Sequence, residues 1–160
     1  IHECAAAAAD LGVPIIADGG VVTSGDIVKA FVAGADCVML GNLLAGVDEA
    51  PGELELVEGA MWKTYRGMGS AGAMRGRAAD RYGTGQTVGK HVAEGVEARV
   101  RYAGPLTELI SQIVGGLRSG MGYAGAADLG DLRHRTRLVR STGAGLRESH
   151  PHDVAVLRDE

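Results

Sequence analysis

The chain has 160 residues, a formal net charge of −4 and 46% hydrophobic residues, which fits one globular domain or part of a larger one. Its sixteen Lys and Arg are dispersed among twenty Asp and Glu, and this argues against nucleic acid as a partner. No apolar run approaches the ~20 residues of a transmembrane helix and no secretory leader opens the chain, so we expect a cytoplasmic protein with no membrane partner.

Two short apolar runs, residues 14–17 and 37–41, each stop at glycine and predict buried parallel strands. Between them, Thr23 and Asp26 have the spacing of a capping box, ahead of a helix that reaches about Ala33. A helix of this length suits the crossover of a βαβ unit. The two strands should therefore be neighbours in one sheet.

The residues that leave these strands favour a nucleotide site. Gly20 and Gly41 bring main-chain N–H groups close to a ligand, and such groups attract anions. Asp18 adds a carboxylate that can accept hydrogen bonds from two adjacent ribose hydroxyls. Asn42 opens a predicted helical turn, 42–45, which would point its N-terminus at the same place. Phosphate bound by loops after the last two strands and by a short extra helix is typical of (β/α)8 barrels, so we expect the closing quarter of such a barrel.

The pattern changes in the second half of the chain. Residues 53–57 and 61–65 alternate as a β-hairpin does. Residues 67–99 are rich in Gly and Ala with weak periodicity, which predicts an inserted, movable flap. An amphipathic helix is expected at 106–117, where paired glycines allow close packing. A short helix at about 129–134 and a C-terminal tail complete the region 106–160.

The chain opens directly inside an alanine-rich helix predicted for residues 2–10, with no strand before it. Parallel strands that are buried on both faces need further strands beside them. We therefore expect the remaining strands upstream, in a longer parent protein. Cys4 and Cys37 are too few for a disulfide framework, and we expect both to be inert structural residues.

Seven motifs, in the same order along nearly the whole chain, resemble the C-terminal part of the catalytic barrel of the IMP dehydrogenase / GMP reductase family. Each motif is weak alone, but the series is specific. The motifs are Ile16-Ala17-Asp18-Gly19-Gly20, Val38-Met39-Leu40-Gly41, Glu49-Ala50-Pro51-Gly52-Glu53, Tyr65-Arg66-Gly67-Met68-Gly69-Ser70, Asp80-Arg81-Tyr82, Gly115-Gly116-Leu117-Arg118-Ser119-Gly120-Met121-Gly122-Tyr123 and Gly143-Ala144-Gly145-Leu146-Arg147-Glu148-Ser149-His150.

The resemblance implies a (β/α)8 barrel that oxidises inosine 5′-monophosphate (IMP) with NAD. A covalent enzyme intermediate forms, and water hydrolyses it to xanthosine 5′-monophosphate. The implied substrate contacts are Asp18 with the ribose, Gly20, Gly41, Asn42 and Tyr65 with the phosphate, and Met68, Gly69 and Glu94 with the hypoxanthine edge. Many family members have serine where this chain has Asn42, whose amide can also donate to phosphate.

The resemblance divides the chemistry between this chain and residues upstream of it. It implies that Arg81, aided by Tyr82, activates the hydrolytic water, and that Tyr123 reaches the NAD site of a neighbouring subunit in a homotetramer. Main-chain carbonyls of Glu148, Ser149 and His150 would bind potassium across a subunit interface. The family's nucleophilic cysteine lies upstream, and neither Cys4 nor Cys37 matches its motif. We therefore expect this chain alone to be inactive.

Two other functions stay open on the sequence. GMP reductase shares the nucleotide seat, the phosphate- and ribose-binding site expected at Asp18, Gly20, Gly41 and Asn42. Its flap is expected to lack the Arg81-Tyr82 pair, so this pair and the Glu148-Ser149-His150 tail favour the dehydrogenase. A non-catalytic nucleotide-binding barrel would keep the seat without the cysteine. Upstream sequence would separate this last alternative from the dehydrogenase.

Overall fold

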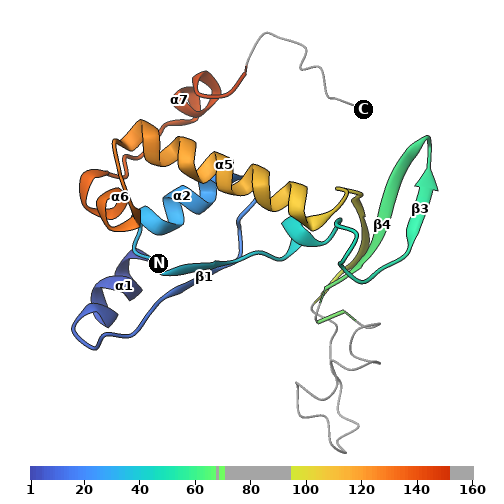
Figure 1. Ribbon diagram of the computed structural model, residues 1–160, viewed down its shortest axis with the longest axis horizontal. Coiled ribbons are helices and arrows are strands. Elements are labelled where there is room, and N and C mark those ends of the chain that lie inside the picture. Colours follow the sequence, from blue (N-terminus) through green and yellow to red (C-terminus); the bar gives the residue numbers. More distant parts are fainter. Residues whose placement is uncertain (68, 71–94, 152–160) are drawn as a thin grey trace, which may run out of the picture.

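The protein has a mixed α/β fold, seen here in a computed structural model that describes residues 1–67, 69–70 and 95–151 (Figure 1). None of the helices in these ranges is long and apolar enough to cross a membrane. In chain order the elements are α1 His2–Ala9, β1 Ile16–Asp18, α2 Ser24–Val32, β2 Cys37–Met39, the 3-10 turn η1 Asn42–Leu44, β3 Leu54–Val57, β4 Ala60–Arg66, β5 Glu97–Arg101, α5 Leu106–Ala124, α6 Leu129–Arg135 and α7 Gly143–Glu148.

The βαβ unit expected from the sequence is present. Strands β1 and β2 pair in parallel, with Ala17 opposite Val38, and α2 connects them. Ala17, Ala30 of α2 and Ala35 form a buried cluster, and Val38 packs against it. Small side chains at these positions let the helix lie close to the sheet.

The expectation that both strands are buried on both faces is wrong for this chain. Ile16 is 57% exposed, Met39 is 51% exposed, and Cys37 is also exposed. Successive side chains of a strand point to opposite faces. Ala17 and Val38 point toward α2, whereas Ile16, Cys37 and Met39 point to the other face, which the described residues leave open.

The capping box predicted at the start of α2 is confirmed. Thr23 is the N-cap, its Oγ1 accepts a hydrogen bond from the Asp26 N–H at 3.3 Å, and the Asp26 carboxylate accepts one from the Thr23 N–H at 2.9 Å. Two main-chain donors at the helix start are thereby satisfied. This cap sets where the loop after β1 ends.

The hairpin is also confirmed, as part of a three-stranded antiparallel sheet in the order β3-β4-β5. Glu58 and Gly59 form its turn with φ of 51° and 80°, both in the left-handed region that tight hairpin turns require. Strand β5 was not predicted. It occupies the last residues of the segment interpreted as a flap at 67–99 and continues to Arg101. Only two of its five residues, Ala98 and Val100, are apolar, which makes a weak strand signal.

Helices α2, α5 and α6 pack against one another on one side of the parallel sheet, and α1 lies apart from them (Figure 1). Helix α5 runs seven residues beyond the predicted end at 117 and stops at Gly125, whose φ of 65° is a common left-handed helix end. Helix α6 buries Leu132 completely. The tail that begins at Gly143 contains α7, which Thr142 caps through a hydrogen bond from the Gly145 N–H.

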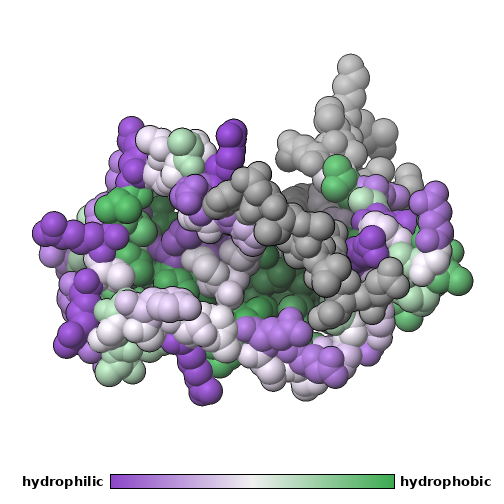
Figure 2. Space-filling view, turned by 90° about the horizontal axis from the view of Figure 1, so that it is seen from above, coloured by the Kyte–Doolittle hydropathy of each residue, from purple (hydrophilic) through white to green (hydrophobic). Residues whose placement is uncertain are grey.

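Only some of the apolar side chains are buried in a core, and many large ones are exposed. Figure 2 shows hydrophobic residues at the surface of a hollow, with hydrophilic residues around it. The large apolar side chains exposed on the open side of the parallel sheet and on the hairpin include Ile16, Met39, Leu54 and Leu56. Exposed apolar area of this kind marks surfaces that contact other parts of a protein.

Candidate functional site

The carboxyl ends of β1 and β2 lie side by side. Asp18 and Met39 are partners in the parallel register, so Gly19-Gly20 and Gly41-Asn42 leave the sheet at the same edge. The structure thus brings together four of the predicted ligand residues: Asp18, Gly20, Gly41 and Asn42. This edge is the usual place for a ligand in a parallel α/β sheet.

The glycines at this edge leave space for a ligand. Gly19 and Gly20 have φ of 90° and 75°, which other residues adopt only with strain. A Cβ built at Gly19, Gly20 or Gly41 meets no atom within 4 Å. Gly19 and Gly20 thus have a backbone conformation that favours glycine, and none of the described residues covers them or Gly41. Close approach of a phosphate to the main chain requires these properties.

Asp18 and Asn42 contribute the polar groups of the seat. Asp18 is exposed at the end of β1. Asn42 begins η1, with Gly41 as N-cap and no side chain capping it. The first N–H groups of a helix have no partner within the helix, and they favour a negative ligand. The arrangement can therefore hold a diol by the carboxylate and an anion by main-chain donors.

Asp26 belongs to the scaffold of the seat. Its Oδ2 accepts hydrogen bonds from the N–H groups of Val22 and Thr23 at 3.2 and 2.9 Å, and its Oδ1 accepts one from Lys29 Nζ at 2.9 Å. The bond from Lys29, followed by one that the Thr23 hydroxyl donates to Oδ2 at 2.9 Å, holds the pKa of the Asp26 carboxyl well below its usual range. These bonds fix the loop between Gly20 and α2.

The other predicted substrate residues lie on the antiparallel sheet or in the segment that it flanks. Tyr65 of β4 pairs with Ala98 of β5. Beyond β4, the Gly67 N–H donates to the Val96 carbonyl and the Gly95 N–H donates to the Gly69 carbonyl, both at 2.9 Å. These bonds close the base of the inserted segment. Met68, Arg81, Tyr82 and Glu94 lie outside the described residues.

A buried lysine, which was not predicted from the sequence, connects the antiparallel sheet to the loop after η1. Lys63 of β4 is 3% exposed, and its Nζ donates to the carbonyls of Val47 and Asp48 at 2.5 and 3.0 Å. Tyr102 Oη donates to Asp48 Oδ1 at 2.7 Å, and this bond raises the pKa of the tyrosine hydroxyl. The signal in the sequence was a lysine between Met61 and Tyr65, on the same face of the strand.

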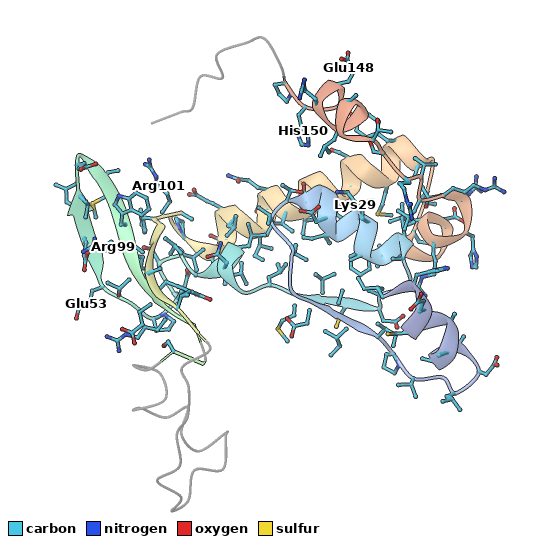
Figure 3. All side chains as sticks on the ribbon, turned by 180° about the vertical axis from the view of Figure 1, so that it is seen from behind. Lys29, Glu53, Arg99, Arg101, Glu148 and His150 are labelled. Atoms are coloured by element: carbon cyan, nitrogen blue, oxygen red, sulfur yellow. The ribbon has the colours of Figure 1, made fainter. Side chains whose placement is uncertain are left out.

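The predicted cofactor and cation residues lie apart from the seat. Tyr123 is 93% exposed on α5. Glu148 and His150 lie at the end of α7, with α5 and α2 between them and the parallel sheet (Figure 3). The Ser149 N–H donates to the Gly145 carbonyl at 3.0 Å, which continues the helical turn. Among the described residues no group of three His, Cys, Asp or Glu side chains could hold a metal ion.

A cavity of about 890 Å³ lies at the opposite, amino end of the parallel strands, between α1 and α6. The Asp36 carboxylate there accepts a bond from the Ile15 N–H at 2.8 Å, and Arg133 donates to the Ala35 carbonyl at 2.7 Å. The bond from Ile15, aided by Arg133, lowers the pKa of Asp36. Asp36 and Arg133 thus already form hydrogen bonds with main-chain groups. We therefore do not assign the functional site to this cavity.

Comparison with known proteins decides the family. Residues 1–152 match the IMP dehydrogenase / GMP reductase domain. The chain belongs to this family. It is 55% identical over 159 residues to an inosine-5′-monophosphate dehydrogenase of Halalkalibacterium halodurans and 56% identical over 160 residues to that of Aquifex aeolicus, covering 99% of this chain in both cases.

A solved family structure agrees with the fold. The crystal structure of a GMP reductase from Trypanosoma brucei in complex with guanosine 5′-monophosphate aligns with a TM-score of 0.83 and 53% identity, over 95% of this chain and 30% of that one. The chain spans about a third of the curated IMP dehydrogenases that it matches, 33% and 32% of their lengths.

Proposed function

We propose that this chain supplies the nucleotide seat and the water-activating segment of an NAD-dependent IMP dehydrogenase of the cytoplasm, as the closing strands of a (β/α)8 barrel. The observation that carries the proposal is the shared strand edge at which Asp18, Gly20, Gly41 and Asn42 meet. Identity of 55% to IMP dehydrogenases along the whole chain supports this reaction. The open face of the parallel sheet would be the inside of the barrel.

In this proposal IMP binds by its phosphate and ribose at the strand edge. The Asp18 carboxylate accepts hydrogen bonds from both ribose hydroxyls. Gly20, Gly41 and Asn42 donate to the phosphate, and the Tyr65 hydroxyl completes its coordination from the antiparallel sheet. The positive φ of Gly20 and the open space over it support these roles.

The inserted segment reads the base and activates water. Met68, Gly69 and Glu94 would contact the hypoxanthine edge, and the bond between Gly95 and Gly69 would hold two of these positions near one another. Arg81, with Tyr82 beside it, would take a proton from the water that hydrolyses the covalent intermediate. An arginine has a free pKa above ~12, so it needs a specially arranged site to act as a base.

The NAD and cation sites are proposed from the family resemblance, and exposure and donor chemistry support them. NAD supplies the hydride acceptor, and the exposed ring of Tyr123 would contact it from a neighbouring subunit of a homotetramer. The carbonyls of Glu148, Ser149 and His150 lie at the C-terminal end of α7, the negative end of the helix dipole. Carbonyl oxygens suit a hard cation such as potassium.

Turnover needs more of the protein than this sequence. Cys4 lies on α1 and Cys37 lies on β2. Both are exposed, and neither matches the family's cysteine motif. We therefore propose that this chain alone is inactive, and that the nucleophile belongs to the part of the relatives that this chain does not span.

GMP reductase is the second candidate, because one solved relative is a GMP reductase that binds guanosine 5′-monophosphate. A non-catalytic nucleotide-binding barrel is the third.

Purified full-length parent protein, incubated with IMP and NAD, should produce NADH, and potassium should accelerate the formation of NADH. Oxidation of NADPH by GMP instead would identify a reductase. Binding of IMP with neither reaction would identify a binding module.

A further inference from the structure

Lys63 is a buried lysine whose amino group ends at the loop after η1. Its Nζ lies 2.5 Å from the carbonyl oxygen of Val47 and 3.0 Å from that of Asp48. An amino group that is removed from water costs stability unless hydrogen bonds satisfy it. The two carbonyls provide such bonds, and they fix the loop relative to β4.

The loop is also held by the main chain. The Asp48 N–H donates to the Gly104 carbonyl at 3.0 Å, and the Ala103 N–H donates to the Gly46 carbonyl at 2.9 Å. A Cβ on Gly46 would stand 2.1 Å from the carbonyl oxygen of Arg101, so the loop passes directly against the end of β5. Hydrogen bonds and close packing therefore hold the loop against the antiparallel sheet.

Lys63 connects two segments of the chain that carry groups proposed to bind one phosphate. Lys63 and Tyr65 are two residues apart on β4, so their side chains share a face of the sheet. Val47 follows Gly41 and Asn42 by only a few residues. Tyr65 belongs to the antiparallel sheet, whereas Gly41 follows β2 of the parallel sheet. The lysine links the antiparallel sheet to the loop that continues from Gly41 through η1 to Asp48.

We propose that Lys63 is a positioning residue for the phosphate of a purine nucleoside monophosphate: it sets the Tyr65 hydroxyl at the right distance from the N–H groups of Gly41 and Asn42. This inference rests on the proposed function. Donors that converge on one ligand must be held within about 0.5 Å, and loss of their support weakens binding even when every donor is still present.

The test is a double-mutant cycle in the full-length parent, with the dissociation constant of IMP measured by calorimetry. Lys63→Met keeps the length of the side chain and removes its donors. We expect it to weaken binding about tenfold in the wild-type background and less than about twofold in Tyr65→Phe, because the lysine acts through the tyrosine. Arg140→Met, which removes the charge of an exposed side chain in the segment between α6 and α7, is the matched control and should leave the constant unchanged.

Equal fold losses in both backgrounds would overturn the proposal, since a merely structural lysine gives independent effects. If Lys63→Met does not fold, Tyr102→Phe loosens the same loop by removing the bond to Asp48, and the same cycle applies with an expected loss of about threefold. A wild-type parent that does not bind IMP would overturn the proposed function itself. Wild-type binding with an additive cycle would overturn the role of Lys63 alone.

Discussion

Gly116 of α5 lies against Ser24 of α2, so closely that a Cβ on the glycine would stand 2.2 Å from the serine Oγ. One turn later, a Cβ on Gly120 would stand 2.6 Å from Val28 Cγ2. The two helices therefore touch along a stripe of glycines. Gly115, the neighbour of Gly116, has no atom within 4 Å of its Cβ position.

This difference predicts opposite effects for two adjacent substitutions. Gly115→Ala should raise the free energy of unfolding by about 0.5–1 kcal/mol, because alanine is the better helix former. Gly116→Ala should lower it by about 1–3 kcal/mol, because the methyl group forces α5 away from α2. Thermal denaturation of the parent protein measures both. Equal effects at the two positions would contradict the packing described for α5.

The carboxylate of Asp18 should contribute to nucleotide affinity and little to folding, since it is exposed at the strand end. Asp18→Ala should weaken IMP binding by about 3 kcal/mol, the lower limit for two hydrogen bonds to a charged group. Calorimetric titration of the parent with IMP measures the loss. Asp10→Ala, an exposed carboxylate at the end of α1, is the control. Unchanged affinity in Asp18→Ala would remove Asp18 from the site.

The local parts of the fold were predictable because their signals are local. The capping box of Thr23 and Asp26, the hairpin around Glu58, and the glycines that end β1 each depend on a few neighbouring residues. The convergence of Asp18 and Gly41 followed from the parallel pairing alone. These features needed no knowledge of distant contacts.

The features that the sequence did not reveal depend on distant pairing. Strand β5 is polar along most of its length, and only its register with β4, Trp62 opposite Arg101, makes it a strand. The guanidinium of Arg101 lies over the Trp62 ring at 4.9 Å from the ring centre, on the sheet face where Figure 3 labels Arg99 and Arg101. The place of Lys63 between Met61 and Tyr65 was visible in the sequence, but its partners were not, because they are main-chain carbonyls and every residue has a carbonyl.

Asp26 makes the stability of α2 depend on pH. Its pKa is lower in the folded protein than the ordinary value of about 3.9, so its contribution is present above that value and is lost as pH falls toward the folded pKa. Asp26→Asn should lower the free energy of unfolding by about 1 kcal/mol at pH 7. The difference from wild type should shrink below about pH 4.

Denaturation at several pH values checks this expectation. Lys29→Met tests the ion pair separately, because Lys29 is 67% exposed and a surface pair contributes only about 0.2–1 kcal/mol, less at high salt. A destabilisation in Asp26→Asn that is the same at pH 3 and pH 7 would show that the carboxylate charge has no part in the cap.

Arg81 is proposed to act in only one half of the reaction, and kinetics can separate the halves. Arg81→Ala should leave the first burst of NADH nearly unchanged, because hydride transfer precedes hydrolysis. The steady-state rate should fall by a factor of about 10²–10⁴, which is the usual contribution of a general base. Arg77→Ala, an arginine of the same segment outside the matched motif, is the control. Equal losses in the burst and the steady state would mean that Arg81 serves substrate binding or folding, and the assignment of the water-activating base to this segment would then be wrong.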